Sequence, residues 1–364
     1  MDERAALHAR AARFLDAAAA GEPSPETFDA LGVAIAQRQA RAIPAYARLC
    51  AARGLDVARA TRVAEFPAVP ADAFRVARIA GHPPDLDRAV FHTSGTTAAP
   101  GVHALSTTDT YARGALAWGR HGLAPDGGRL RAIVLAPPPD EAPRSSLGFM
   151  IALFAQAFGV DPVWVVSGGE VDAEGLAHAA EAAARSGERA MVLGTSFAFV
   201  HALDALAGRA LALPPGSRVM HTGGYKGRSR EVAPDALRAA IAATFAVPEA
   251  HVVGEYGMTE LSSQLYEGTL RAALGFSTPT ARHGVFFPPP WLRVVPVDVD
   301  LLQPVAPGEV GLLRFEDLAN VDAAVAVQTA DRGRLVGGGV ELLGRAPGAT
   351  PRGCSIAMDE LLSG

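Results

Sequence analysis

The pattern of apolar and polar positions changes twice along the chain. Residues 1–84 read as a helical region, with helices at about 2–20, 26–42 and 44–53 and Ser24-Pro25 as the start signal of the second. From 85 to 285, short apolar runs alternate with longer helical stretches. The runs interpreted as buried strands are 130–135, 163–166, 190–193, 218–220 and 251–253, and the expected helices lie at about 146–158, 172–186, 196–208 and 231–246. Such alternation predicts an α/β fold with doubly wound parallel sheets.

Beyond residue 285 the pattern becomes one of Pro-rich turns and short alternating strands, such as Leu292–Val299 and Val310–Phe315. This predicts a small antiparallel β region. A stretch rich in Pro and Gly follows and predicts a flexible tail before a short terminal helix. We therefore expect four parts: an N-terminal helical region (1–84), an α/β core (85–285), a β-rich part of the same domain (286–345) and a tail that carries Cys354 (346–364).

Composition excludes several classes of protein. The net charge of −5 over 364 residues gives no electrostatic case for binding nucleic acid or an anionic membrane. No apolar run approaches the roughly 20 residues of a membrane span, and the N-terminus does not read as a signal peptide. The two cysteines, Cys50 and Cys354, are too few for a disulfide framework. We expect a cytoplasmic globular protein.

A loop rich in hydroxyl groups follows the strand-like run Ala89-Val90-Phe91. Glycine lets a backbone approach an anion closely, and hydroxyls with neighbouring N–H groups supply hydrogen-bond donors. The loop therefore predicts a phosphate cradle that needs no lysine, although an ordinary surface loop has the same composition. Its donors would come from Thr93, Ser94, Gly95, Thr96 and Thr97.

A second motif, Glu255-Tyr256-Gly257-Met258-Thr259-Glu260, comes directly after the apolar run 251–253. The ring of Tyr256 can stack on a purine, and the hydroxyl of Thr259 can reach a phosphate. The carboxylate of Glu260 can hold Mg²⁺ on a nucleotide. The alternative is a turn at a strand end with a solvated Glu260.

A third motif, Thr329-Ala330-Asp331-Arg332-Gly333, is followed after a hairpin by Gly344-Arg345. An aspartate at a strand end can accept hydrogen bonds from two ribose hydroxyls. The alternative is a salt bridge that flanks the hairpin.

In this order, the three motifs resemble the adenylate-forming enzymes: acyl-CoA synthetases, peptide-synthetase adenylation domains and firefly-type luciferases. The resemblance covers roughly residues 85–345 and implies the large-domain fold of those enzymes. It implies that the hydroxyl-rich loop embraces the phosphates of ATP and that Tyr256, Gly257, Thr259 and Glu260 serve adenine, the α-phosphate and Mg²⁺. It also implies that Asp331 binds ribose, with Arg345 nearby.

A narrower resemblance is to the acyl-protein synthetases, the LuxE-like branch of these enzymes. It rests on three further stretches and on Leu261-Ser262-Ser263-Gln264 after the second motif. The three stretches are Gly194-Thr195-Ser196-Phe197-Ala198-Phe199-Val200-His201, Thr222-Gly223-Gly224-Tyr225-Lys226-Gly227-Arg228-Ser229 and Asp317-Leu318-Ala319-Asn320. This resemblance implies that Gly223 and Gly224 contact the nucleotide; the alternative for this pair is a turn at the start of a helix. In that branch a cysteine near the C-terminus accepts the acyl group, and Cys354 matches its place.

The sequence departs from the adenylate-forming pattern in two ways. The usual Gly and Lys after the Thr-Thr pair are replaced by Ala98 and Val102-His103. His103, Arg228 and Lys226, the only lysine in the chain, are candidates to replace that charge. Lys226 and Arg228 are also candidates to bind the acid carboxylate or the phosphates. The chain also ends about 19 residues after Gly344-Arg345, so the resemblance implies that the usual mobile C-terminal domain is absent.

These features predict ATP- and Mg²⁺-dependent activation of a carboxylic acid, fatty or aryl, to acyl-AMP. The acyl group would then pass to the thiol of Cys354 and on to a partner protein, a reductase or a carrier. Two alternatives stay open. The acyl group could pass directly to CoA, a carrier or an amine, or the chain could be a nucleotide-binding partner without catalytic activity.

Overall fold

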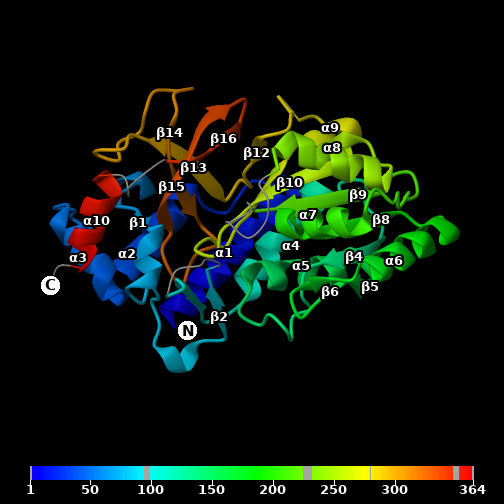
Figure 1. The fold of residues 1–364 in the computed structure, drawn as a ribbon. Helices are drawn as coiled ribbons and strands as arrows, with labels where there is room; N and C mark the ends of the chain where they lie inside the picture. The colour runs from blue at the N-terminus through cyan, green and yellow to red at the C-terminus, as the bar shows by residue number, and fades with distance from the viewer. Residues whose placement is uncertain (1, 94–98, 224–231, 279, 347–351, 363–364) are drawn as a thin grey trace. The chain divides into compact units, whose positions relative to one another are not determined.

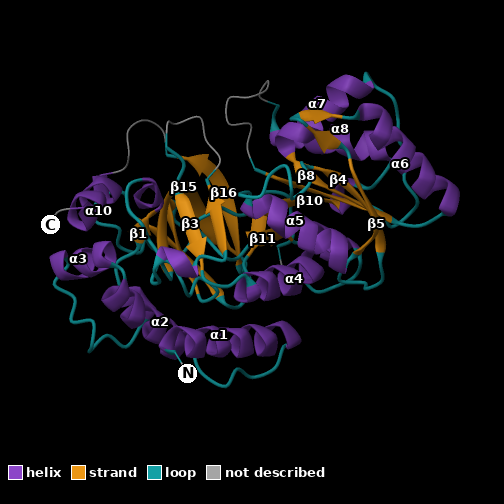
Figure 2. Cartoon of the chain, turned by 90° about the horizontal axis from the view of Figure 1, so that it is seen from below, coloured by secondary structure: helices purple, strands orange, loops and turns teal. Residues whose placement is uncertain are grey.

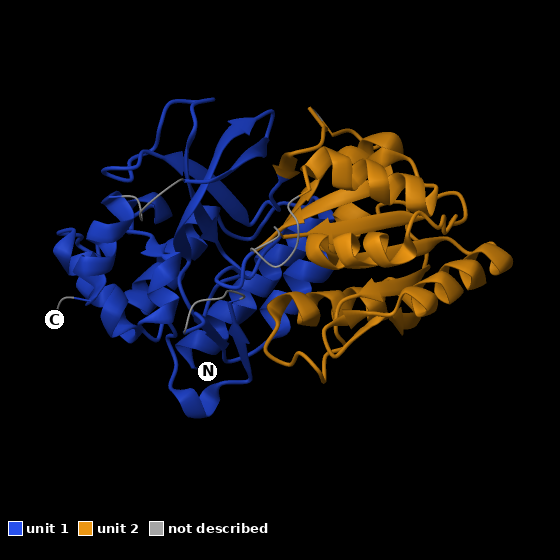
Figure 3. Cartoon of the chain, viewed as in Figure 1, with its two compact units in different colours: residues 1–117, 258–264, 287–364 blue, residues 118–257, 265–286 orange. Residues whose placement is uncertain are grey.

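The computed structural model describes residues 2–93, 99–223, 232–278, 280–346 and 352–362 (Figure 1). Figure 2 distinguishes the helices from the strands, which alternate through the middle of the chain. The chain divides into two compact units, which Figure 3 colours separately. The first comprises residues 1–117, 258–264 and 287–364, and the second comprises 118–257 and 265–286.

The first unit begins with three helices close to the predicted ones: α1 (Glu3–Ala20), α2 (Phe28–Ala42) and α3 (Pro44–Ala52). Asp2 caps α1 by accepting a hydrogen bond from the N–H of Arg4, and Thr27 caps α2 by accepting from Ala30. Helix α2 thus begins at Phe28, after its cap Thr27, and not at the predicted Ser24-Pro25. Short 3₁₀ helices follow: η1 (Val63–Glu65), η2 (Ala71–Arg75) and η3 (Pro84–Leu86).

An antiparallel sheet forms the middle of the first unit, as predicted for the β-rich region. Its strands pair in the order β13 (Leu292–Val297), β14 (Gly311–Asp317), β15 (Ala326–Val336) and β16 (Gly339–Arg345), and β1 (Val69–Pro70) joins β15 in parallel. A separate hairpin consists of β2 (Ala89–His92) and β3 (Val102–Leu105). The last helix, α10 (Arg352–Leu362), packs beside α3 (Figures 1 and 2).

The second unit contains the predicted parallel sheet. Its parallel strands run in the order β10 (Val252–Tyr256), β9 (Arg218–Thr222), β8 (Ala190–Thr195), β4 (Leu130–Leu135) and β5 (Gly159–Trp164). Strand β11 (Leu265–Glu267) pairs antiparallel with β10 and is followed by β12 (Val285–Phe287). The unit also contains the small hairpin β6 (Val166–Ser167) and β7 (Glu170–Val171), and the 3₁₀ helix η4 (Glu249–His251).

Helices cover both faces of this parallel sheet. Apolar side chains of α6 (Ala173–Ser186), α7 (Ser196–Leu206) and α8 (Pro234–Phe245) form one core with alternate residues of β4, β8, β9 and β10. On the other face lie α5 (Ser146–Ala157) and the end of α4 (Asp109–Leu123), where a Cβ at Gly119 would meet Phe154. The short helix α9 (Thr269–Ala273) completes the unit. The doubly wound arrangement is therefore as predicted.

Strand β5 begins earlier than the predicted strand 163–166. Asp161 and Pro162 interrupt its apolar pattern, so the pattern did not predict the first half of the strand. Both are tolerated because β5 is the edge strand beside β4 in this unit, where a missing N–H and a polar side chain face outward. Within the described part of the chain, no helix has both the length and the apolarity that crossing a bilayer requires.

Candidate active site

The hairpin of β2 and β3 carries the hydroxyl-rich loop of the first unit. Its base is closed by Thr93, whose N–H donates to the carbonyl of Gly101 (2.9 Å) and whose Oγ1 accepts from the N–H of Gly101 (2.7 Å). A Cβ at position 101 would lie 2.9 Å from Cγ2 of Thr93, so this closure requires glycine. Four of the predicted phosphate-binding residues lie outside the described residues: Ser94, Gly95, Thr96 and Thr97.

The second motif contacts this hairpin through Thr259. Its hydroxyl donates to the carbonyl of His92 (3.5 Å), the residue directly before Thr93. Glu260 follows, and 8% of its surface is exposed. Residues of the first two motifs, 167 positions apart, therefore meet in the first unit.

His103 does not take the place of the missing loop lysine. Its side chain is fully buried, its Nδ1 faces the carbonyl of Thr259, and its Nε2 lies 3.1 Å from Oδ1 of Asn320. Burial lowers the pKa of the imidazole, so the ring is neutral near pH 7. A neutral ring whose two nitrogens already contact groups inside the protein cannot supply positive charge to phosphates.

Segment 258–264 is held by residues at the end of β14 and directly after it. The carboxylate of Asp317 accepts from the N–H of Ser262 (2.9 Å) and the hydroxyl of Ser263 (2.7 Å). Burial raises the pKa of Asp317 to about 6, although these bonds act in the opposite direction. Asn320 donates to the carbonyl of Glu260 (2.9 Å). The sequence analysis used Asp317–Asn320 only as part of the resemblance and assigned these residues no role. The feature that could have indicated a role is the pair of polar residues on either side of two apolar ones.

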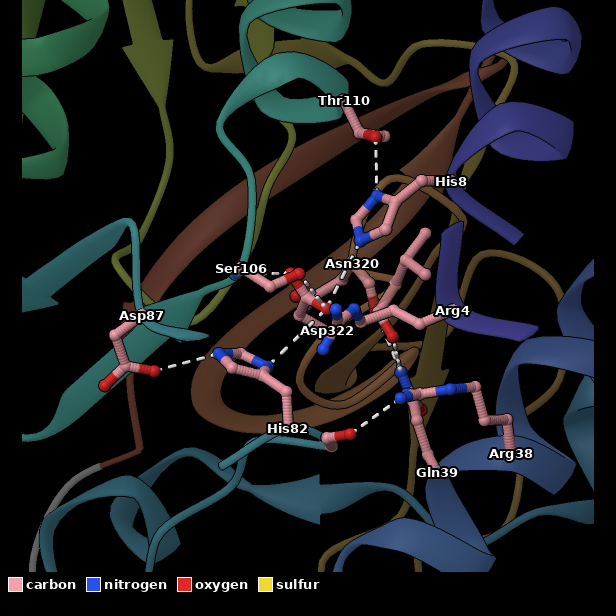
Figure 4. A network of polar contacts seen from close by, with 12 residues as sticks. Arg4, His8, Arg38, Gln39, His82, Asp87, Ser106, Thr110, Asn320 and Asp322 are labelled. Atoms are coloured by element: carbon pink, nitrogen blue, oxygen red, sulfur yellow. Dashed lines mark hydrogen bonds and ion pairs between the residues drawn. The ribbon is translucent and has the colours of Figure 1, made fainter. Parts of the chain in front are cut away.

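A buried polar network holds the loop that contains Asn320 and Asp322 against the rest of the first unit (Figure 4). The carboxylate of Asp322 accepts from the N–H of Ser106 (2.7 Å) and lies 3.2 Å from Nε2 of His8, with His82 on its other side. Burial alone would raise the pKa of Asp322, but the hydrogen bonds and charges of these partners hold it at about 2. The loop that carries Asn320 is therefore fixed by an ionised carboxylate.

The third motif lies on paired strands of the first unit. Asp331 of β15 is the register partner of Arg345 of β16, and Nε of Arg345 lies 3.4 Å from Oδ1 of Asp331. The Arg345 side chain is 71% exposed, so the pair contributes little to stability. The N–H of Asp331 also donates to the hydroxyl of Thr329 (3.1 Å). This geometry matches the salt-bridge alternative, and the ribose role of Asp331 stays a prediction.

Four of the predicted nucleotide-binding residues belong to the second unit: Tyr256, Gly257, Gly223 and Gly224. Tyr256 ends β10, and its ring meets the edge of the Phe286 ring with centroids 6.4 Å apart. Gly223 follows β9 with a φ of 76°, a left-handed conformation that favours glycine. Gly224, Lys226 and Arg228 lie outside the described residues.

A buried acid stands next to Tyr256. Glu255 of β10 is the register partner of Thr222 of β9, and the Thr222 hydroxyl donates to its carboxylate. Burial raises the pKa of Glu255 to about 7, against the effect of this hydrogen bond. These residues lie at the carboxyl ends of parallel strands, the edge where ligands bind in open α/β sheets. The sequence analysis assigned Glu255 no role, although an acidic residue within an apolar strand could have marked it as a candidate site residue.

Cys354 lies within α10 and not on the flexible arm that was expected. Its side chain is buried against Val297 and Leu312, and burial raises the pKa of its thiol to about 11. Two bonds tie the end of α10 to α3 and the residue directly after it: Nε of Arg48 donates to the carbonyl of Leu361 (3.0 Å), and Nε of Arg53 donates to the carboxylate of Glu360 (2.6 Å). Cys50 is buried too, and burial raises its pKa to about 12.

Comparison with known proteins identifies the family. The sequence model of the acyl-protein synthetase family LuxE matches residues 34–363. The chain belongs to the LuxE acyl-protein synthetase family. As a member it is an ATP-dependent ligase that forms acyl-adenylates, which confirms the predicted resemblance and class of enzyme. None of the curated proteins matches the chain significantly.

Solved structures with a similar fold are adenylate-forming enzymes, as the sequence predicts. An open form of 2-hydroxyisobutyryl-CoA ligase, with 2-HIB-AMP and CoA, has a TM-score of 0.60 and 13% identity over 89% of this chain and 76% of its own. ATP-bound MatB from Rhodopseudomonas palustris has a TM-score of 0.51 and 16% identity over 73% and 49%. The amide bond synthetase McbA from Marinactinospora thermotolerans has a TM-score of 0.50 and 19% identity over 80% and 53%. The LuxE-family chain thus spans about half the length of MatB and McbA.

Proposed function

We propose that this ligase activates a carboxylic acid as acyl-AMP and passes the acyl group through the thiol of Cys354 to a partner protein. The observation that supports the first step best is the hydrogen bond from Thr259 to the carbonyl of His92. It brings the Thr259-Glu260 pair to the strand end from which the hydroxyl-rich loop starts. We therefore propose that Thr259 and Glu260 act on a phosphate that this loop holds.

In the first step a carboxylate oxygen of the acid attacks the α-phosphorus of ATP, and pyrophosphate leaves. Negative charge builds on the phosphorus oxygens, so donors that are already in position lower the barrier. In our proposal Thr93, Ser94, Gly95, Thr96 and Thr97 supply backbone and hydroxyl donors. Thr259 supplies a further hydroxyl.

Glu260 fits the role of a magnesium ligand. A carboxylate is a hard oxygen donor, and Mg²⁺ is commonly held by one or two carboxylates together with substrate phosphates. When bound, the ion would neutralise charge on the phosphates. In the described part of the chain, His, Cys, Asp and Glu form no group of three or more that could hold a metal by themselves.

We propose nucleotide and acid contacts for the remaining predicted residues. Tyr256, Gly257, Gly223 and Gly224 serve adenine and the acyl-adenylate, and Asp331 with Arg345 serves ribose. Lys226 serves the acid carboxylate or the phosphates. The acid is fatty or aryl in this proposal. The sequence places Phe197, Phe199 and Met220 beside these motifs, but Phe199 and Met220 are fully buried in the structure, so Phe197 is the candidate among them to contact the acid.

In the second step the sulfur of Cys354 attacks the acyl carbonyl, AMP leaves, and the thiol proton is lost to solvent. The partner, a reductase or a carrier, then takes the acyl group from the thioester. The family's description as acyl-protein synthetases supports this step. Release of α10 has to come first, because the thiol is buried and protonated while the helix is docked.

The same burial favours a second candidate, in which acyl-AMP reacts directly with CoA, a carrier thiol or an amine. One experiment separates the two. The protein is incubated with ATP, Mg²⁺ and a panel of fatty and aryl acids; pyrophosphate exchange reports the first step, and a protein adduct labile to hydroxylamine reports the second.

We expect Cys354→Ala to abolish the adduct and leave the exchange intact, and Cys50→Ala to preserve both. An adduct of undiminished yield on Cys354→Ala contradicts transfer through this thiol and supports the direct route. Absence of acid-dependent exchange with every acid in the panel contradicts the first step.

A further inference from the structure

Two side chains, and not the hydrogen bonds of a helix or sheet, hold the backbone carbonyls of Thr259 and Glu260. Both residues lie in a turn outside the helices and strands, so no helix or sheet partner is available for their carbonyls. His103 faces the carbonyl of Thr259, and Asn320 donates to the carbonyl of Glu260 at 2.9 Å. Both side chains are fully buried. Two successive carbonyls are thus bound by rigid groups.

The orientation of Asn320 follows from its partners. Its Nδ2 donates to two carbonyls, those of Glu260 (2.9 Å) and Ala324 (2.8 Å), so its Oδ1 is the atom that faces His103. The hydroxyl of Ser262 lies 3.4 Å from this Oδ1 and supplies it with a donor. Oδ1 of Asn320 and the carbonyl of Thr259 are both acceptors, so a neutral imidazole can donate to only one of them.

The proton of the neutral ring belongs on Nδ1. Nδ1 makes the shorter of the two ring contacts, and Oδ1 of Asn320 already has a donor in the hydroxyl of Ser262, so we place the proton on Nδ1. Burial lowers the pKa of His103 and keeps the ring in the neutral form. His103 accordingly donates from Nδ1 to Thr259.

The supports of these two side chains are themselves rigid. His103 lies on β3 and packs edge-to-face on Phe74, with ring centroids 5.9 Å apart. The backbone around Asn320 is bound by Gln39 of α2, whose amide donates to the carbonyls of Asn320 (2.9 Å) and Val321 (3.0 Å). The body of the first unit therefore holds the Thr259-Glu260 pair in place through these buried contacts.

We propose that His103 and Asn320 are positioning residues for acyl-adenylate formation: they fix the Thr259-Glu260 backbone and thereby aim the Glu260 carboxylate. The inference rests on the proposed role of Glu260. It gives His103 a function different from the phosphate contact that its place after the loop suggests. A carboxylate that holds Mg²⁺ needs such support, because loss of an outer-shell partner commonly costs about 10–100-fold in activity.

Two substitutions of His103 separate the two ring nitrogens. The amide nitrogen of asparagine is as many bonds from Cα as Nδ1 of histidine, whereas that of glutamine matches Nε2. His103→Asn thus keeps the donor to Thr259, and His103→Gln loses it. His103→Leu is a second variant without the donor, for use if glutamine prevents folding.

We measure kcat and KM for ATP in acid-dependent pyrophosphate exchange, with the free energy of unfolding from urea titration. We expect His103→Asn to keep kcat within about threefold of the wild type, and His103→Gln and His103→Leu to lose about 10–100-fold with little change in KM. The Mg²⁺ concentration for half-maximal rate should rise in the last two. The control is His251→Gln, a buried histidine of the second unit whose Nδ1 faces the carbonyl of Ser217 (2.9 Å); it should lose stability and keep kcat.

The inference is overturned if His103→Asn loses as much kcat as the variants without the donor, or if His103→Gln keeps full kcat. It is also overturned if the losses follow the free energy of unfolding alone. Failure of the proposed function looks different: either the wild type shows no acid-dependent exchange, or Glu260→Gln exchanges as fast as the wild type. The comparison among His103 variants does not involve Cys354.

Discussion

Gly353 packs so closely on Leu302 that a Cβ at position 353 would lie 2.7 Å from Cγ of Leu302. Its N–H donates to the carbonyl of Val299 (2.9 Å), and Cys354 is the next residue along α10. The start of this helix therefore sits against the chain around residues 299–302. An added methyl group there has to be accommodated by a shift of the helix.

We predict that Gly353→Ala loosens α10 and exposes the thiol of Cys354. Overpacking of this kind costs about 1–3 kcal/mol, which corresponds to roughly 5–150-fold faster alkylation of Cys354 if labelling requires release of the helix. Iodoacetamide labelling followed by peptide mass spectrometry gives the rate for each cysteine. Ile356→Ala, on the outer side of the same helix, and the rate at Cys50 are the controls and should not change. Equal labelling of Cys354 in the wild type and Gly353→Ala would show that the helix is not the barrier.

We predict that Glu260→Gln lowers acid-dependent pyrophosphate exchange about 10²–10³-fold, because one charge that stabilises the transition state is removed. The fold should remain, since glutamine has nearly the same volume and the carbonyl of residue 260 still binds Asn320. Circular dichroism and urea titration check the fold. Undiminished exchange in Glu260→Gln would exclude this residue from the chemistry.

We predict that Asp331→Ala raises KM for ATP about tenfold or more while kcat falls less. A hydrogen bond from ribose to a charged group contributes about 1.5–3 kcal/mol and is equally present in the ground and transition states. Arg345→Gln removes the ion pair and keeps the carboxylate, so its KM should change less. Equal kinetics in both variants and the wild type would leave Asp331 as the partner of Arg345 only.

We predict that Glu255 makes the folded protein less stable as pH rises. Burial raises its pKa from 4.5 to about 7, so its favourable contribution is complete below pH 4.5 and is lost as pH rises through 7. Relative to Glu255→Gln, the free energy of unfolding of the wild type should therefore fall by about 3 kcal/mol between pH 4.5 and 8.

Urea titration of both proteins at several pH values measures this difference. Asp317, whose pKa burial raises to about 6, acts in the same direction but is present in both proteins and cancels. A difference that does not vary with pH would show that the pKa of Glu255 is the same in the folded and the unfolded protein.

Much of the fold could be predicted because its signals are local. Apolar runs separated by helical stretches located β4, β8, β9 and β10, and Pro-rich alternation located the antiparallel sheet of the first unit. Strand β5 was misplaced because Asp161 and Pro162 break its apolar pattern, which only an edge position tolerates. Whether a strand lies at the edge depends on the strand order of the sheet, which the local spacing of apolar residues does not show.

The candidate site could be predicted where it consists of contiguous motifs, such as Thr93 and the Thr259-Glu260 pair. His103 and Asn320 were assigned differently or not at all, because their partners lie 156 and 60 positions away in the sequence. Burial decides the chemistry of such residues: it occupies the ring of His103 and raises the pKa of the Cys354 thiol. Helix α10 was predicted in part, but the sequence did not show that its first turn is packed.

The packing of Cys354 against Val297 and Leu312 has a consequence for a loaded enzyme. A core contact at ordinary protein density has no free volume for an added acyl group. If the thiol carries the acyl group, α10 cannot return to the position seen here, and the apolar side chains beneath it stay uncovered. The loaded and unloaded proteins would then present different surfaces, so a partner that binds the uncovered one could select the molecules that carry an acyl group.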